Sequence, residues 1–384
     1  MLDLSTVLAA PVTATFLGDF GADVVKVEEP GRGDFTRQRE DGARSPHWAQ
    51  EARNKRSITC DLRTEAGQDL VRRLVPRFDV VVTNYRPLTL DAWGLAPERL
   101  SEIAPRTVIA CLSAYGLTGP YRDRGAFDRV ASSFAGLTHV TGYADRPPVR
   151  SGYAVIDYMS AYLAAFGVMV ALYHRDVHGA AGQVIDLALY EAGFRASEDA
   201  LVRHHVDGVV RERSGNVNER IVPATDLDTR DGRRVSVHAG TDSLFRRLQS
   251  VVGPVLGDPR FASRTGRIEH QEELYSLLRA WAAELTADEV TTRCSDAGIP
   301  AAPLMSVADI AADPHYRERG SIVTVDDEDF GPLPMPAVYP RLSVTPGSIR
   351  SPGPSLGSAN QDVYGGLLGL SDDELAALTD AGVI

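Results

Sequence analysis

The sequence predicts an α/β protein with a Rossmann-like large domain, built on a parallel sheet, and a smaller α+β domain. Short apolar segments alternate with helical patterns over residues 2–112, which is typical of parallel strands covered by helices on both faces. A hairpin pattern followed by three helical patterns begins only after residue 215 and indicates the second domain. The length of 384 residues is enough for two or three domains.

The large domain is expected to start with a strand, a helix and a strand. Residues 2–4 form the first strand, Pro11 enters a helix that ends near Phe20, and residues 24–28 form the second strand. The intervening residues 5–11 lack the G-x-G-x-x-G pattern, so the usual dinucleotide-binding fingerprint is missing.

The same alternation continues along the chain. The predicted elements are helix 65–75, strand 80–82, helix 97–103, strand 108–112, helix 153–173 and strand 183–189. Apolar side chains fall on all sides of the 153–173 helix, which predicts that this helix is buried.

The small domain is expected to combine a hairpin with helices. Residues 223–238 form the hairpin, which turns at Asp231-Gly232. Helices follow at residues 244–252, 271–283 and 287–297. From residue 313 the chain is Pro-rich and is predicted to be irregular until a last helix at residues 372–381.

Charge and composition exclude several classes of protein. Forty Lys and Arg against 52 Asp and Glu give a formal net charge of -12, which argues against a nucleic-acid partner. The N-terminus has no basic segment before an apolar stretch, and no run of about 18 uncharged apolar residues follows, so we expect a soluble, cytoplasmic protein without a membrane partner. Cys60, Cys111 and Cys294 lie far apart without metal-type spacing, so neither disulfides nor a zinc site is expected.

Asp157 is the first polar residue of the long helix pattern and has two interpretations. It follows Ala154-Val155-Ile156, where the side chain of an Asp commonly caps a helix. Alternatively, helix N–H groups keep its carboxylate ionised among apolar neighbours, and an ionised, partly desolvated Asp is a competent nucleophile towards a thioester. The local sequence alone favours the cap.

Basic residues gather close to where strands are predicted to end. They are Arg32, Arg37, Arg53, Lys55, Arg56 and Arg63. Parallel sheets bind ligands at the carboxyl ends of their strands, and arginine suits phosphate because its hydrogen bonds are bidentate. A solvated basic face is the alternative interpretation.

An ordered set of short motifs resembles the class III CoA-transferases over nearly the whole chain. The motifs are Leu2-Asp3-Leu4-Ser5, Gly21-Ala22-Asp23-Val24-Val25-Lys26-Val27-Glu28, Arg53-Asn54-Lys55-Arg56-Ser57-Ile58, Asn84-Tyr85-Arg86-Pro87, Ser113-Ala114-Tyr115-Gly116-Leu117-Thr118-Gly119-Pro120, Phe127-Asp128, Asp157, Gly182-Gln183-Val184-Ile185-Asp186, Asp258-Pro259-Arg260-Phe261 and Leu368-Gly369-Leu370-Ser371. Only residues 195–215 lie outside the resemblance. The family also includes formyl-CoA transferase, carnitine CoA-transferase and 2-methylacyl-CoA racemase.

The resemblance implies a catalytic role for Asp157 and a pocket for CoA. The carboxylate at this position is the covalent nucleophile in the family, which reverses the local preference for a cap. The residues that would line the CoA nucleotide pocket are Arg37, Leu62, Arg63, Asn84, Tyr85 and Arg86. The partners would be an acyl-CoA donor and a carboxylic acid acceptor, with coenzyme A entering as the substrate thioester and with no metal and no redox cofactor.

The resemblance also implies an interlocked homodimer in which both ends of the chain build the large domain. The expected boundaries are residues 1–195 for the N-terminal part of the large domain, 196–215 for a linker, 216–312 for the small domain, and 313–384 for the return linker and the C-terminal part of the large domain.

Two alternatives to CoA transfer are weighed. Racemases of the family have His before the Asp of the Phe127-Asp128 motif, and Phe127 cannot take a proton, so two-base racemisation lacks its second base. His139 lies in an apolar run and is interpreted as a structural histidine. The other alternative is a catalytically silent CoA-binding protein, against which Asp157 and the full set of motifs weigh.

Overall fold

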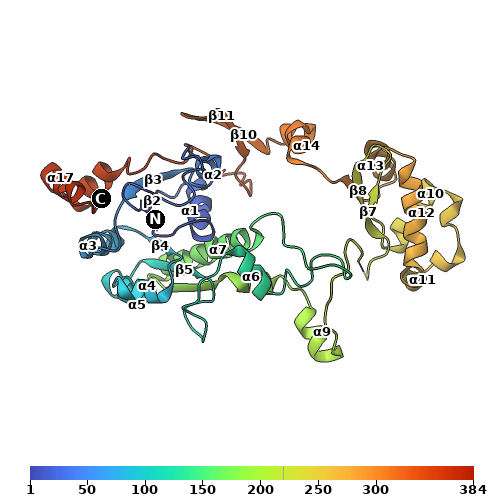
Figure 1. Cartoon of the computed structure of the whole chain (residues 1–384), viewed down its shortest axis with the longest axis horizontal. Coiled ribbons are helices and arrows are strands. Elements are labelled where there is room, and N and C mark those ends of the chain that lie inside the picture. Colours follow the sequence, from blue (N-terminus) through green and yellow to red (C-terminus); the bar gives the residue numbers. More distant parts are fainter. Residues whose placement is uncertain (219) are drawn as a thin grey trace. The chain divides into compact units, whose positions relative to one another are not determined.

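The computed structural model describes residues 1–218 and 220–384, and the chain forms two compact units (Figure 1). The first unit comprises Met1–Thr138, Arg150–Asp207 and Arg319–Ile384, so both ends of the chain contribute to it. The second unit comprises His139–Val149 and Gly208–Glu318.

The first unit is built on a six-stranded parallel sheet with the strand order β3-β2-β1-β4-β5-β6. The strands are β1 (Leu2–Asp3), β2 (Val24–Glu28), β3 (Lys55–Thr59), β4 (Val80–Thr83), β5 (Val108–Ser113) and β6 (Val184–Ala188). Leu2 pairs with Val25 and Val81 on its two sides, so β1 lies in the middle of the sheet. The predicted α/β class with a parallel sheet is confirmed.

Helices cover both faces of this sheet (Figure 1). One face packs against α3 (Glu65–Leu74), α4 (Pro87–Ala92), α5 (Pro97–Ile103) and α17 (Asp372–Asp380). The other packs against α1 (Ala9–Asp19), α6 (Asp128–Phe134), α7 (Val155–His178) and α8 (Leu189–Arg195). Because successive strand residues point to opposite faces, Val81 and Ile109 enter the first core, whereas Val80 and Ala110 enter the second.

The long helix α7 packs against the sheet along one side only. Its buried apolar residues include Ala161, Ala164, Val168 and Ala171, which follow the spacing of one helix face. On another side, Phe166 and Tyr173 are each 69% exposed. The prediction of burial on all sides is therefore wrong for the single chain, within the residues that the structure describes. By length and composition α7 could cross a membrane, but a core helix of a soluble protein passes the same test, so this evidence is weak.

The second unit joins a three-stranded antiparallel sheet to a group of helices. The strands, in spatial order, are β7 (Ala224–Asp228), β8 (Arg234–His238) and β9 (Ala301–Pro303). The helices are α10 (Asp242–Val252), α11 (Arg264–Glu269), α12 (Gln271–Ala283), α13 (Ala287–Asp296), α14 (Val307–Ala312) and α15 (Pro314–Glu318). Strands β7 and β8 form the predicted hairpin around Asp231 and Gly232, and the unit has its own core around Phe245, Phe261 and Tyr275.

The return segment contains a hairpin where the Pro-rich sequence predicted irregular chain. Strand β10 (Ile322–Asp327) pairs antiparallel with β11 (Gly331–Pro336). The prolines of β11 occupy alternate positions, 332, 334 and 336, so all three point their backbone nitrogen, which has no N–H group, to the same edge of the strand. The residues between them have N–H groups at the opposite edge, where these can pair with β10. The remaining helices are α2 (Pro46–Glu51), α9 (Ala200–Asp207) and α16 (Gly366–Leu368).

Candidate active site

A cavity of about 240 Å³ opens at the carboxyl ends of four neighbouring strands, β1 to β4. Its lining comprises Ser5, Thr6, Val27, Glu28, Glu29, Gly33, Asp34, Cys60, Asp61, Leu62, Arg63, Tyr85 and Trp93. Parallel sheets bind their ligands at this edge, because the loops that follow the strands converge there. The cavity is therefore the candidate substrate-binding site of the first unit.

Three of the six residues predicted for the CoA pocket line this cavity: Leu62, Arg63 and Tyr85. The Tyr85 ring packs edge-on against Trp93, with the ring centroids 4.8 Å apart. Arg63 is largely exposed, and its guanidinium lies 2.8 Å from a carboxylate oxygen of Asp61 and 2.8 Å from one of Glu29. The cavity thus combines aromatic and apolar surface with one guanidinium group at the solvent, and four acidic residues, Glu28, Glu29, Asp34 and Asp61, also line it.

The other three predicted residues do not line the cavity. Arg37 is buried and holds Glu28 with two hydrogen bonds, Nε to Oε2 at 2.6 Å and Nη2 to Oε1 at 2.7 Å. Asn84 accepts a hydrogen bond from the Thr6 N–H (2.9 Å) and donates one to the Thr6 carbonyl oxygen (2.6 Å). Arg86 is exposed at the start of α4. Arg37 and Asn84 therefore support residues that line the cavity.

Besides Arg37 and Arg63, three more of the predicted basic residues form ion pairs within the protein. The pairs are Arg53 with Asp19, Lys55 with Asp3 and Arg56 with Asp23, at N–O distances of 2.7, 2.9 and 2.6 Å. All three carboxylates belong to the strand–helix–strand segment at the N-terminus, beside which β3 pairs. The interpretation as a free phosphate-binding cluster or a solvated face is therefore wrong for Arg53 and Lys55, which are buried, whereas the pair of Arg56 with Asp23 lies at the surface.

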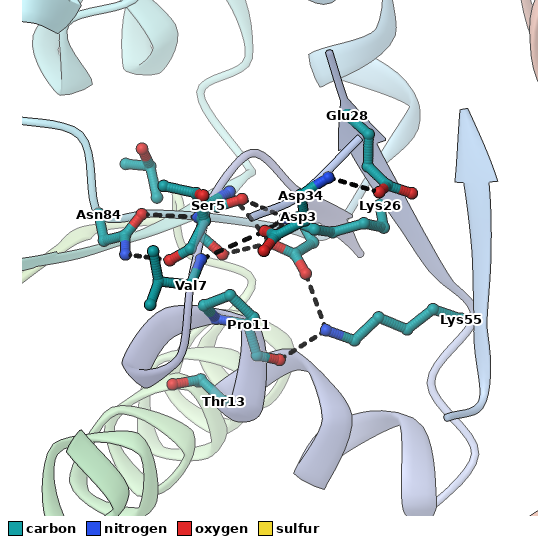
Figure 2. Close-up of polar contacts among 12 residues, drawn as sticks. Asp3, Ser5, Val7, Pro11, Thr13, Lys26, Glu28, Asp34, Lys55 and Asn84 are labelled. Carbon is teal, nitrogen blue, oxygen red and sulfur yellow. Dashed lines mark hydrogen bonds and ion pairs between the residues drawn. The ribbon is translucent and has the colours of Figure 1, made fainter. Parts of the chain in front are cut away.

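A buried ion cluster, formed by Asp3, Lys26, Asp34 and Lys55, lies next to the cavity (Figure 2). The Lys26 ammonium is 3.4 Å from Asp34 and 3.8 Å from Asp3. Burial alone would raise the pKa of Asp3, but Lys26 and Lys55 hold this pKa below its ordinary value. Burial likewise opposes the charge of Lys26, yet Asp3 and Asp34 raise its pKa. Both groups are therefore charged at neutral pH.

The ion cluster fixes the loop that follows β1. Lys26 donates to the carbonyl oxygen of Ser5, and Asp34 accepts from the N–H of Val7 at 3.2 Å (Figure 2). Val7 has a φ of 70°, which is a strained conformation for a β-branched residue. The sequence contains a signal for this arrangement, because Lys26 lies between Val25 and Val27 in a strand whose only other charged residue is the terminal Glu28.

Asp157 lies in the first turn of α7, with 8% of its surface exposed. Helix α7 connects β5 to the parallel strand β6, so it runs against the strand direction and starts at the carboxyl edge of the sheet. Asp157 is thus at the same edge as the cavity, although it is not among the cavity-lining residues.

The backbone N–H groups of this first turn all have partners other than the Asp157 side chain. Those of Ile156 and Asp157 donate to Asp128 Oδ1, at 2.8 and 3.3 Å. Those of Val155 and Tyr158 donate to backbone carbonyl oxygens just before the helix. In the described part of the chain, no donor or cation contacts the Asp157 carboxylate. The cap role that the local sequence alone favoured for Asp157 is therefore wrong, since Asp128 caps the helix.

Burial raises the pKa of Asp157 to about 7, and the Asp128 carboxylate adds to the rise. The expectation that helix N–H groups keep Asp157 ionised is not met, because Asp128 has taken those groups. Near neutral pH, Asp157 exists in both protonation states, a perturbation that is common at functional sites.

Two side chains considered as proton carriers have other surroundings. Phe127 precedes α6, is 71% exposed and has no ionisable group. His139 belongs to the second unit, where its Nε2 lies 3.3 Å from a carboxylate oxygen of Glu212. Among the described residues, no group of three or more His, Cys, Asp and Glu side chains could hold a metal ion.

Comparisons with known proteins give consistent matches over the full chain. The family model described as CoA-transferase family III matches residues 1–360. A succinyl-CoA–D-citramalate CoA-transferase of Chloroflexus aurantiacus is 42% identical, over 100% of this chain and 96% of that protein. The beta subunit of a succinyl-CoA–L-malate CoA-transferase of the same organism is 41% identical, with the same two coverages.

More distant proteins show the same similarity. A succinyl-CoA:glutarate CoA-transferase of Homo sapiens is 30% identical, over 100% of this chain and 88% of that protein. The crystal structure of a CAIB/BAIF family protein from Brucella suis superposes with a TM-score of 0.84 and 31% identity, covering 95% of this chain and 97% of that chain.

Proposed function

The chain belongs to CoA-transferase family III, and from this premise we propose that it transfers CoA from succinyl-CoA to a short dicarboxylic acid by covalent catalysis at Asp157. As a class III CoA-transferase it is an enzyme that acts on CoA thioesters. The observation that supports Asp157 is its buried carboxylate, which lacks a hydrogen-bonding or ionic partner within the described residues. A carboxylate without such partners keeps its lone pairs available for attack on an acyl carbon.

In the first half of the proposed reaction, an oxygen of the ionised Asp157 attacks the thioester carbonyl carbon of the donor. The C–S bond breaks, CoA leaves as the thiolate, and a mixed anhydride joins Asp157 to the donor acyl group. The thiolate then attacks the aspartyl carbonyl carbon. The donor leaves as a free carboxylate, and Asp157 holds CoA as an aspartyl thioester.

In the second half, the acceptor carboxylate attacks the aspartyl carbonyl carbon and expels the thiolate, which leaves a second anhydride. The thiolate attacks the acceptor carbonyl carbon, so the acceptor departs as the new acyl-CoA and Asp157 is again a carboxylate. No proton or electron is gained or lost over the cycle. The protein therefore has to position the reactants and to exclude water from the anhydrides.

We propose the 240 Å³ cavity as the binding site for the nucleotide part of CoA. Arg63 would bind phosphate, and Leu62 and Tyr85 would contact the adenine. Arg86, which follows Tyr85 and is exposed, would give a further phosphate contact. Arg37 and Asn84 would hold the walls of the site through Glu28 and Thr6, as their hydrogen bonds indicate.

The proposed acyl groups follow from what the relatives are named for. Succinyl-CoA is the donor in the names of the citramalate, malate and glutarate transferases, and each acceptor is a short dicarboxylate. A homodimer is also part of the proposal. The uncovered apolar side of α7, with Tyr162, Phe166 and Tyr173, would be buried by a second subunit, because large exposed apolar surfaces mark association sites.

A CoA-exchange assay tests the proposed reaction. Purified protein is incubated with succinyl-CoA and with citramalate, malate or glutarate in turn, and the new acyl-CoA is measured by mass spectrometry. Asp157→Ala should abolish transfer, whereas Asp176→Ala, an exposed position on the same helix, should not. Transfer by Asp157→Ala above a tenth of the wild-type rate would contradict the nucleophile assignment.

The same preparations separate the alternatives. Hydroxylamine added during turnover should modify the peptide that contains Asp157, because it attacks anhydrides and thioesters. A racemase would instead exchange the α-proton of a 2-methylacyl-CoA in D₂O without any acceptor. A silent CoA-binding protein would bind CoA and show neither reaction.

A further inference from the structure

Asp128 has a specific geometric relation to the first turn of α7. It is the first residue of α6, and one oxygen of its carboxylate, Oδ1, accepts hydrogen bonds from the N–H groups of Ile156 (2.8 Å) and Asp157 (3.3 Å). The start of α7 has no side-chain cap of its own, since the residue before it is Ala154. Asp128 therefore supplies from another helix what α7 lacks.

The bonds to Asp128 also decide what the Asp157 side chain can do. An acidic residue in the first turn of a helix is normally drawn to the free N–H groups there, which stabilise and engage its carboxylate. With these N–H groups occupied by Asp128, the Asp157 carboxylate remains without a donor. The Asp157 carboxylate therefore lies at the start of α7 without capping this helix.

Packing on the other side of the turn restricts the same segment. A Cβ atom on Gly193 of α8 would lie 2.4 Å from Ile156 Cδ1 and 2.8 Å from Ala135 Cβ. The first turn of α7 is therefore in close contact with α8, which in turn lies against the end of α6, and the Asp128 bonds act on a turn that has little room to shift.

We propose that Asp128 is the positioning residue for the nucleophile, holding the first turn of α7 by its backbone N–H groups while placing a second negative charge beside Asp157. This inference rests on the proposed function of Asp157. Asp128 does not itself contact the reacting atoms in this scheme. It keeps the nucleophile free of its own helix and makes the nucleophile's charge depend on pH in the neutral range.

The other ionisable groups on the elements packed against α7 have different partners or positions. They are Asp19 in α1, Glu51 in α2, Arg129 in α6, Cys111 in β5, Asp186 in β6, and Tyr190, Glu191 and Arg195 in α8. Glu51 accepts a hydrogen bond from the Tyr158 hydroxyl of α7 at 2.9 Å. Asp19 pairs with Arg53, Asp186 accepts from the Leu117 N–H, and Glu191 accepts from the Ala188 N–H. Burial and Asp128 are the two causes of the raised pKa of Asp157. Removing the charge of Asp128 should therefore act on Asp157 directly.

Two substitutions separate the acceptor from the charge. Asp128→Asn keeps an oxygen that can accept the two N–H bonds but removes the charge, whereas Asp128→Ala removes both. Asp231→Asn is the matched control, because Asp231 also accepts from a first-turn helix N–H, that of Ala287 at 3.2 Å in α13 of the second unit. For each protein, kcat and kcat/KM for CoA transfer from succinyl-CoA are measured from pH 5 to pH 9.

The wild type should lose kcat/KM at acid pH with a midpoint near 7, the pKa of Asp157 in the free enzyme. Asp128→Asn should move this midpoint down by about one pH unit and keep most of the activity at high pH. Asp128→Ala should lower the plateau at least about tenfold below that of Asp128→Asn, since the freed N–H groups then engage Asp157. Asp231→Asn should leave the profile unchanged.

Other outcomes overturn the inference and leave the function separately testable. An unchanged midpoint in Asp128→Asn refutes the charge effect, and equal plateaus for Asn and Ala refute the positioning by the acceptor oxygen. In either case an inactive Asp157→Ala still supports the nucleophile. An active Asp157→Ala, by contrast, would remove the proposed function itself. If Asp128→Ala does not fold, the midpoint of Asp128→Asn alone decides.

Discussion

Replacing Asp157 by Asn should abolish transfer and at the same time stabilise the folded protein above neutral pH. The carboxylate is buried, has no donor within the described residues and has a pKa raised to about 7. Such a group is unfavourable in its charged form, because folding removes it from water without compensation. Asn removes the charge and keeps the size of the side chain, so the folded state no longer has to hold an anion there.

The magnitude and its sign follow from the change in pKa on folding. Below the ordinary Asp pKa of 3.8, both states of the wild type hold the proton and Asp157 has no pH-dependent effect. Between that value and about 7, the folded state keeps a proton that the unfolded state has lost, so each pH unit lowers the wild-type unfolding free energy by about 1.4 kcal/mol. Above pH 7 the loss stays at its full value, about 4 kcal/mol.

Urea unfolding of the wild type and of Asp157→Asn at pH 5 and pH 8 measures this difference. The stability advantage of the variant should be about 3 kcal/mol larger at pH 8 than at pH 5, and any constant effect of the amide cancels in the comparison. Asp176→Asn on the same helix is the control. Arg175 lowers the pKa of Asp176 below its ordinary value of 3.8, so this carboxyl is ionised in both the folded and the unfolded state at pH 5 and at pH 8, and the stability difference of the control should not change between them. An advantage of Asp157→Asn that does not grow with pH would refute the reasoning.

Three further substitutions test other parts of the structure. Lys55→Met leaves Asp3 buried with one cation fewer and should lower the unfolding free energy by about 3–5 kcal/mol in urea titrations; a loss below about 1 kcal/mol would contradict the buried ion pair. Gly193→Ala would press on Ile156 and should lower stability by about 1–3 kcal/mol and slow CoA transfer, whereas a gain, as helix propensity alone predicts, would contradict the close contact. Arg63→Ala should weaken CoA binding in calorimetry by about tenfold but leave pantetheine thioesters nearly unaffected; equal losses would show a structural role.

The sequence predicted most of the elements of the fold, and the misses have physical causes. Strand β3 was not predicted because Lys55 and Arg56 are residues expected at the surface. Arg56 is indeed partly exposed, whereas Lys55 is buried and is compensated there by its ion pair with Asp3. The hairpin of β10 and β11 was not predicted because prolines usually end strands, unless they occupy alternate positions as they do in β11.

The sequence predicted which residues belong to the candidate site better than it predicted the hydrogen bonds and ion pairs that these residues form. Arg37 was expected to bind phosphate, yet the structure pairs it with Glu28. A sequence motif does not show whether an arginine contacts the phosphate of a ligand or a carboxylate of the protein itself. Asp128 stood in a motif without an assigned role, since the N–H groups that donate to its carboxylate lie 28 and 29 residues further along the chain. Sequence patterns describe one helix at a time, whereas here a side chain of α6 caps the start of α7.

Asp3 and Asp157 show how one protein prepares two buried carboxylates for different tasks. Burial acts on both in the same direction and would raise both pKa values. Asp3 is surrounded by Lys26, Lys55 and donors from Ser5, so its pKa falls, and its charge is stabilised and committed to holding the loop after β1. Asp157 meets another carboxylate instead, so its pKa rises and its charge remains uncompensated. A carboxylate whose charge is uncompensated, such as that of Asp157, is stabilised when a substrate carbon accepts its electron pair, whereas the compensated carboxylate of Asp3 is not. We therefore assign the structural role to Asp3 and the chemical role to Asp157.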